Sequence, residues 1–197
     1  MTTNGSPPFS VTRRSAVFSL ACMFLTPRLA AAAKAEQPFV LPPEFLPQLV
    51  DYTSPEAIGT IVIEPAKRFL YFVEAYGVAR RYGVGVGRAG ATFRGSATIE
   101  RKAKWPAWRP TANMIKRNPE KYAKYAQGMP GGPGNPLGSR ALYLYRDGVD
   151  TFYRIHGTTE PWSIGKAVSN GCIRMLNEHL EELYDRVPLG TKVVVIA

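Results

Sequence analysis

Cysteine and histidine are scarce in this chain of 197 residues, which contains only two of each. A zinc site usually takes four ligands, and His156, His179 and Cys172 fall short of such a set. The sequence also lacks the lysine-serine or lysine-threonine ending of a phosphate loop and any recognisable nucleic-acid-binding motif. We therefore expect no metal, no cofactor and no nucleic-acid partner.

Acidic residues are absent from the first 33 positions, which contain three arginines, two of them adjacent at Arg13 and Arg14. The apolar run that follows, residues 16–25, is too short to cross a bilayer as a helix. Adjacent arginines, a short apolar run and a later alanine tract are typical of a twin-arginine export signal. We assign residues 1–35 to that signal and expect a periplasmic protein. Without residues 1–33, a net charge of +7 remains of the total of +10, and this positive charge suits an anionic partner.

Loss of this signal would leave a single cysteine in the exported protein. Cys22 lies within the apolar run, and a lipoprotein signal ending there is the alternative. Cys172 then has no partner for an intramolecular disulfide. Because a lone thiol is a liability in an oxidising compartment unless it is used, this favours a catalytic cysteine.

The remaining cysteine and one histidine lie in the same stretch. His156 ends an alternating apolar run, and Cys172 follows a Ser-Asn-Gly turn at residues 169–171. Glycine and proline between them allow a loop that folds back on itself. A neighbouring imidazole favours the thiolate, so we expect His156 to lower the pKa of Cys172 below its ordinary value of about 8.5.

His156-Gly157 and residues 169–174, Ser-Asn-Gly-Cys-Ile-Arg, resemble the active-site signature of the L,D-transpeptidase family, cysteine enzymes that cross-link peptidoglycan. The resemblance runs from about residue 59 to the C-terminus. Many members carry a second histidine directly before Gly-Cys, where this chain has Asn170. The family's fold implies a mostly β domain with short helices, a β-sandwich of mixed sheets with the cysteine in a groove.

The resemblance also implies a role for each motif residue. Cys172 would be the nucleophile and His156 the base, oriented by the backbone carbonyl of Gly157. The oxyanion-binding turn would comprise Ser169, Asn170 and Gly171, with the peptide N–H of Cys172 as a further donor. Arg174 would bind substrate by pairing with a carboxylate of the stem peptide, or would brace the loop, and Trp162 would also bind substrate.

The same resemblance implies a substrate, the peptidoglycan tetrapeptide stem ending in D-alanine. The enzyme would acylate Cys172 with this stem, release D-alanine and form a 3–3 cross-link with a neighbouring stem. Water as acceptor would make it an L,D-carboxypeptidase, and an outer-membrane protein as acceptor would make it an anchoring enzyme. A non-catalytic wall-binding protein is a further alternative, which the intact His156 and Cys172 pair disfavours.

Short strands dominate the predicted secondary structure. The proline-rich residues 36–58 are expected to be extended, as a linker or a surface strap, before a catalytic domain at 59–197. Strands are predicted at 59–64, 68–75, 79–87, 97–104 and 192–196, with a hairpin of 139–145 and 151–156 around Asp147-Gly148.

Helix signals occur at two places. One helix is expected from the cap Asn118 to residue 127, and another over residues 177–187 with Asn177 as cap. His179, in the first turn of the second helix, is expected to be solvated or capping. Two features stay open: Trp105 and Trp108 either cover a groove or pack the domain edge, and the glycine-rich residues 128–138 form either a wall of the site or a structural loop.

Overall fold

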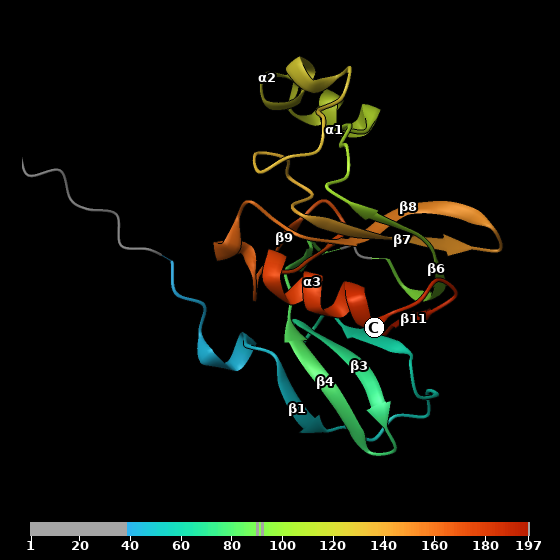
Figure 1. Ribbon diagram of the computed structural model, residues 1–197. Coiled ribbons are helices and arrows are strands. Elements are labelled where there is room, and N and C mark those ends of the chain that lie inside the picture. The colour runs from blue at the N-terminus through green and yellow to red at the C-terminus, as the bar shows by residue number, and fades with distance from the viewer. Residues whose placement is uncertain (1–38, 90, 92, 197) are drawn as a thin grey trace, which may run out of the picture. The chain divides into compact units, whose positions relative to one another are not determined.

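The computed structural model describes residues 39–89, 91 and 93–196 of the chain (Figure 1). The predicted export signal, residues 1–35, lies outside the described residues. A nine-stranded sheet runs through the described part, in the order β1 (Gln48–Asp51), β4 (Val78–Gly83), β3 (Phe69–Ala75), β2 (Ile61–Glu64), β11 (Lys192–Val195), β6 (Gly95–Lys104), β7 (Arg140–Arg146), β8 (Val149–His156) and β10 (Ile173–Arg174). A second, parallel pair consists of β5 (Val86–Gly87) and β9 (Ala167–Ser169).

The sheet is mixed, and its last strand in sequence occupies its middle. β11 runs parallel to β2 and antiparallel to β6, so it joins the β1–β4 half to the β6–β10 half. One core cluster takes buried side chains from both halves and from helix α3 (Asn177–Arg186), including Ile63, Leu142 and Leu180. Strands predominate, the main sheet contains both parallel and antiparallel pairs, and its two halves share one core. The predicted fold class, mostly β with mixed sheets and short helices, is therefore confirmed.

Helix α3 follows its predicted apolar stripe but not its predicted cap. Leu180 and Leu183 are fully buried, and the helix ends at Arg186, before Pro188. The N-cap is Leu176, which makes no capping bond through its side chain. The capping role predicted for Asn177 is wrong, because its side chain points instead to two neighbouring loops.

His179 is also not the solvated or capping residue that we expected. Its side chain is buried, and its Nδ1 has no hydrogen-bond partner in the described part of the chain. Burial lowers the pKa of this imidazole. Leu41 and Leu46 of the N-terminal segment line the same surface hollow as His179.

The predicted hairpin is confirmed. β7 and β8 pair antiparallel around Asp147 and Gly148, whose φ angles of +52° and +73° match the left-handed conformations that an Asp-Gly turn favours. A register shift between Tyr143 and Tyr145 produces a bulge in this pair. Within the bulge, Phe152 has a φ of +63°, which is unusual for a bulky residue.

The single strand predicted over residues 79–87 is wrong, because the chain changes partners within it. β4 pairs with β3, whereas β5 pairs with β9, which belongs to the segment from Gly157 to Arg174 that carries the motif and is called the motif loop below. At the junction, Gly85 and Arg174 exchange backbone hydrogen bonds of 2.8 and 2.9 Å. This switch anchors the motif loop on both sides of Cys172.

The described part of the proline-rich segment, residues 39–58, is a strap and not a free linker. A 3₁₀ turn, η1 (Pro43–Phe45), precedes β1, and β1 pairs with β4 at the edge of the sheet. Phe45 packs against Gly83 and Gly165, where a Cβ atom would come within 2.4 and 2.6 Å of it. β1 thus extends the sheet beyond the predicted start of the catalytic domain at residue 59.

The helix predicted from Asn118 to residue 127 is shorter than expected and belongs to a larger helical cap, residues 112–125. The helical cap comprises α1 (Ala112–Arg117), α2 (Pro119–Tyr122) and η2 (Ala123–Tyr125). Asn118 caps α2 as predicted, because its Oδ1 accepts the N–H of Lys121 at 3.0 Å. Thr111 caps α1 in the same way. None of the helices in the described residues has the length and apolar character needed to cross a membrane.

Candidate active site

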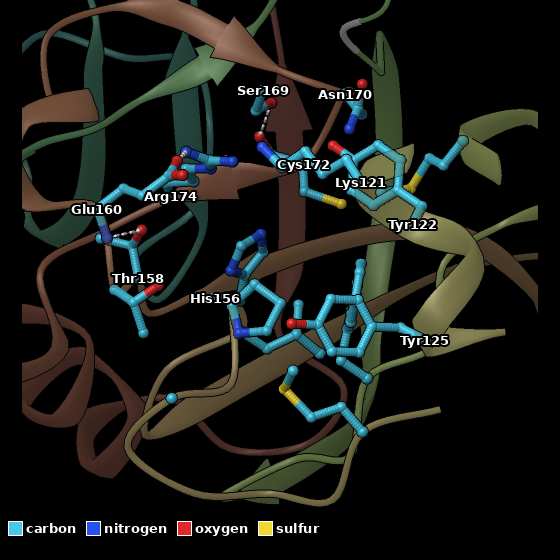
Figure 2. Close-up of a pocket in the computed structure, with 17 residues that line it drawn as sticks. Lys121, Tyr122, Tyr125, His156, Thr158, Glu160, Ser169, Asn170, Cys172 and Arg174 are labelled. Atoms are coloured by element: carbon cyan, nitrogen blue, oxygen red, sulfur yellow. Dashed lines mark hydrogen bonds and ion pairs between the residues drawn. The ribbon is translucent and has the colours of Figure 1, made fainter. Parts of the chain in front are cut away.

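One cavity of about 240 Å³ brings the motif residues together with the helical cap (Figure 2). The motif supplies His156, Ser169, Asn170, Cys172 and Arg174; the helical cap supplies Met114, Lys121, Tyr122 and Tyr125; other walls come from Trp108, Thr158, Thr159, Glu160 and the glycine-rich residues Met129, Gly134, Pro136 and Leu137. Figure 2 shows the Cys172 and His156 side chains between Glu160 and Arg174 on one side and the cap tyrosines on the other. The cavity is therefore closed by segments far apart in sequence.

His156 is a buried, oriented imidazole at the end of β8. Its Nδ1 lies 2.6 Å from the carbonyl oxygen of Gly157. A carbonyl can only accept, so Nδ1 carries the proton and Nε2 has a free lone pair. Burial lowers the pKa of His156 to about 4, and the positive charges of Arg174 and Arg154 act in the same direction. The hydrogen bond to the Gly157 carbonyl opposes this shift. At neutral pH this histidine is a neutral base.

Cys172 lies in the loop between β9 and β10 and is half-buried. Its thiol is 3.9 Å from the carbonyl oxygen of Phe152, a weak S–H contact to the β8 bulge. Burial raises the pKa of the Cys172 thiol, although a backbone hydrogen bond from Arg154 and the charges of Arg154 and Arg174 oppose the shift. The lowered thiol pKa that the sequence led us to expect is therefore wrong for this structure, because burial outweighs the nearby positive charges.

Ser169 and Gly171 fix the turn that presents Cys172. The Ser169 hydroxyl donates to the Cys172 carbonyl at 2.6 Å and accepts the N–H of Gly171 at 3.0 Å. Gly171 has a φ of +135°, and a Cβ there would lie 2.7 Å from both the Ala91 carbonyl oxygen and the Tyr153 ring. Only glycine fits this position without a shift in the backbone.

The other motif side chains have partners within the protein. Arg174 pairs with Glu160 at 2.5 Å. Asn170 accepts a hydrogen bond from Arg117 of the helical cap at 3.1 Å, so it ties the cap to the motif loop. Trp162 is 53% exposed and is not among the residues that line this cavity.

Several cavity residues escape sequence reasoning. Tyr122 and Tyr125 lie three positions apart on the cap, and both contact Trp108, with ring centroids 6.2 and 5.8 Å away. Trp108 thus lines the groove, whereas Trp105 does not. The glycine-rich residues 128–138 form a wall of the site. The Lys-Tyr-Ala-Lys-Tyr run at 121–125 is the signal that could have located the aromatic wall.

Across the described residues, no group of three or more histidine, cysteine, aspartate or glutamate side chains is arranged to hold a metal ion.

The L,D-transpeptidase catalytic-domain family matches residues 58–195 of the chain. The chain belongs to this family. That match confirms the resemblance seen in the residues around His156 and Cys172, and it covers the cavity and every strand of the sheet except β1.

The chain is similar in sequence to curated proteins and in fold to solved structures. It is 39% identical over 140 residues to "Probable L,D-transpeptidase ErfK/SrfK" of Salmonella typhimurium, covering 70% of this chain and 44% of that protein. The chain thus spans less than half the length of this curated relative. The Ldtfm-avibactam carbamoyl enzyme shares the fold, with a TM-score of 0.53 and 18% identity over 72% of this chain and 50% of that chain.

A solved structure from Brucella melitensis is more similar in sequence. It is 56% identical, has a TM-score of 0.55, and covers 79% of this chain and 96% of that chain. That protein is described as a "Probable carnitine operon oxidoreductase caia". The catalytic-domain match over residues 58–195 assigns the present chain to the L,D-transpeptidase family.

Proposed function

We propose that this L,D-transpeptidase acylates Cys172 with a peptidoglycan tetrapeptide stem, releases D-alanine and transfers the acyl group to a neighbouring stem as a 3–3 cross-link. The observation that carries the proposal is a thiol and a neutral, oriented imidazole lining one cavity. The family match supports peptidoglycan stem peptides as the substrate class.

In the first step, the Cys172 thiol gives its proton to Nε2 of His156 while the sulfur attacks the carbonyl carbon of the third stem residue. The S–C bond forms and the carbonyl electrons move to oxygen. Collapse of this tetrahedral intermediate breaks the amide bond, and the departing D-alanine nitrogen takes the proton from His156. A thioester on Cys172 remains.

In the second step, the amine of a neighbouring stem attacks the thioester carbonyl. His156 accepts a proton from this amine and returns it to the leaving sulfur, so the thiol and the neutral imidazole are restored. The Gly157 carbonyl would hold the ring in place, because it accepts from Nδ1 at 2.6 Å.

The developing oxyanion needs a donor in the turn before the sulfur. Gly171, named for this role from its sequence position, already donates its N–H to Ser169. We therefore assign the Cys172 N–H as the oxyanion donor, with Ser169, Asn170 and Gly171 holding the turn. For Trp162, a role in substrate binding would have to involve substrate outside this cavity.

The acceptor decides between three reactions. A stem amine gives a 3–3 cross-link, water gives a shortened tripeptide stem, and an amine of an outer-membrane protein gives a protein anchored to the wall. Incubation of the purified protein with sacculi, followed by mass spectrometry of the released muropeptides, separates the first two. We expect 3–3 linked dimers that are absent with Cys172→Ala. Tripeptides without dimers would establish the carboxypeptidase, and unchanged muropeptides with a folded, soluble protein would contradict the proposal.

A further inference from the structure

Two cationic side chains line the active-site cavity, and they differ in what surrounds them. Arg174 is held by Glu160 at 2.5 Å, so this pair presents little net charge. Lys121 lines the wall contributed by the helical cap, and no carboxylate of the described residues lies within ion-pairing distance of it. The uncompensated charge of the cavity therefore belongs to Lys121.

The backbone around Lys121 is well defined. Asn118 accepts its N–H at 3.0 Å, which fixes the start of α2. The ammonium group lies 5.5 Å from the centre of the Tyr122 ring, a long cation–π contact that leaves its hydrogen-bonding protons available. Glu120 is the one acid in residues 109–127, against five arginines and lysines, so the segment itself offers little neutralisation.

Figure 2 places Lys121 and the cap tyrosines across the cavity from Glu160 and Arg174, with Cys172 and His156 between them. A ligand whose carbonyl reaches the sulfur would lie between the two sides. An anionic group on it would meet the free ammonium on the side of the cap, because the opposite cation is already paired. The flat faces of Tyr122 and Tyr125 would flank the aliphatic parts of such a ligand.

We propose that Lys121 is a specificity-determining residue that binds a carboxylate of the donor stem peptide. This inference rests on the proposed function, and it transfers to Lys121 the carboxylate-binding role that the sequence suggested for Arg174. The bond is a charge-assisted hydrogen bond from Nζ to a carboxylate oxygen. It requires a free acid on the stem and should be lost when that acid is an amide.

The test measures binding without catalysis, by calorimetry on the Cys172→Ala protein. Three ligands are compared: a tetrapeptide stem with free carboxylates, the same stem ending in D-alaninamide, and the same stem with its other carboxylates amidated. Lys121→Met removes the positive charge and keeps an aliphatic side chain of similar length, whereas Lys121→Arg keeps the charge. Lys124→Met is the matched control, because Lys124 lies on the same cap, 5.0 Å from the Tyr125 ring, but does not line the cavity.

We expect Lys121→Met to weaken binding of the free-acid stem about five- to tenfold, as for a partly exposed charge-assisted bond. Lys121→Arg should bind within about twofold of the Cys172→Ala parent, and so should Lys124→Met. One of the two amidated stems should bind the Cys172→Ala parent weakly, and its affinity should not fall further in Lys121→Met. The amide in that stem marks the carboxylate that Lys121 binds.

Three results would overturn the inference. Equal losses in Lys121→Met and Lys124→Met would mean that only the overall charge of the cap matters. If the parent binds the stem and Lys121→Met binds it with the same affinity, the role proposed for Lys121 is contradicted and the proposed function is not. A folded Cys172→Ala protein that binds none of the stems would defeat both.

Discussion

At the scale of single residues, the protonation states of His156 and Cys172 determine how acylation should depend on pH. Burial lowers the pKa of His156 to about 4 and raises that of the Cys172 thiol, so the pair is an imidazole and a thiol at neutral pH. The base is active only when deprotonated. The rate should therefore rise as pH increases through about 4 and then stay flat through neutral pH.

Single-turnover acylation by a carbapenem, followed by intact-protein mass spectrometry from pH 3.5 to 9, measures this curve. His156→Ala should lose most of the rate and the acidic limb. Asn170→Ala should keep the parent's curve, because an amide exchanges no proton in this range. A parent rate that climbs about tenfold per pH unit between 7 and 8 would instead indicate attack by a thiolate formed before substrate binds.

The local part of the site could be predicted from the sequence, whereas its surroundings could not. His156, Gly157 and Cys172 lie within 17 positions of one another and carry a recognisable pattern. The contribution of Lys121 depends on how the helical cap folds over the groove. The direction of the thiol pKa shift depends on burial, which a residue pattern does not contain.

At the scale of secondary-structure elements, Asn177 couples helix α3 to the loop that follows His156. Its Oδ1 accepts the N–H groups of Ser139 and Thr158, both at 3.2 Å. Asn177→Ala would leave these donors without their partner, so we expect the free energy of unfolding to fall by about 2 kcal/mol. Acylation should slow as well, because Thr158 is two residues from the base.

Urea unfolding and the acylation assay together check this expectation, with Asn177→Asp as the matched control because it keeps an acceptor oxygen. If Asn177→Ala unfolded at the parent's urea concentration, the two contacts would contribute nothing to stability.

Elements with a strong local signal were predictable, and those defined by distant partners were not. The Asp-Gly hairpin and the apolar stripe of α3 follow from neighbouring residues. The division of β4 from β5 follows from pairing with β9, which lies some 80 positions away. α1 has six residues, too few for a helical period to stand out in the sequence.

At the scale of the whole molecule, the proposed cross-linking activity would require the protein to reach the cell wall. We propose that residues 1–35 direct export to the periplasm by the twin-arginine route. Replacing Arg13 and Arg14 together with lysine should leave the precursor inside the cell, as fractionation and immunoblotting would show. Mature protein in the periplasm at the parent's level would indicate the general secretory route instead.

The central claim, that Cys172 is the acylated nucleophile of this L,D-transpeptidase, is tested most directly by intact-protein mass spectrometry after incubation with a carbapenem. The parent should gain the mass of one drug molecule, and peptide mapping should place it on Cys172. Cys172→Ala should remain folded, because the half-buried thiol contacts its surroundings through a weak bond to the Phe152 carbonyl and a backbone N–H of Arg154, and it should gain no mass. An adduct of undiminished yield on Cys172→Ala would contradict the account.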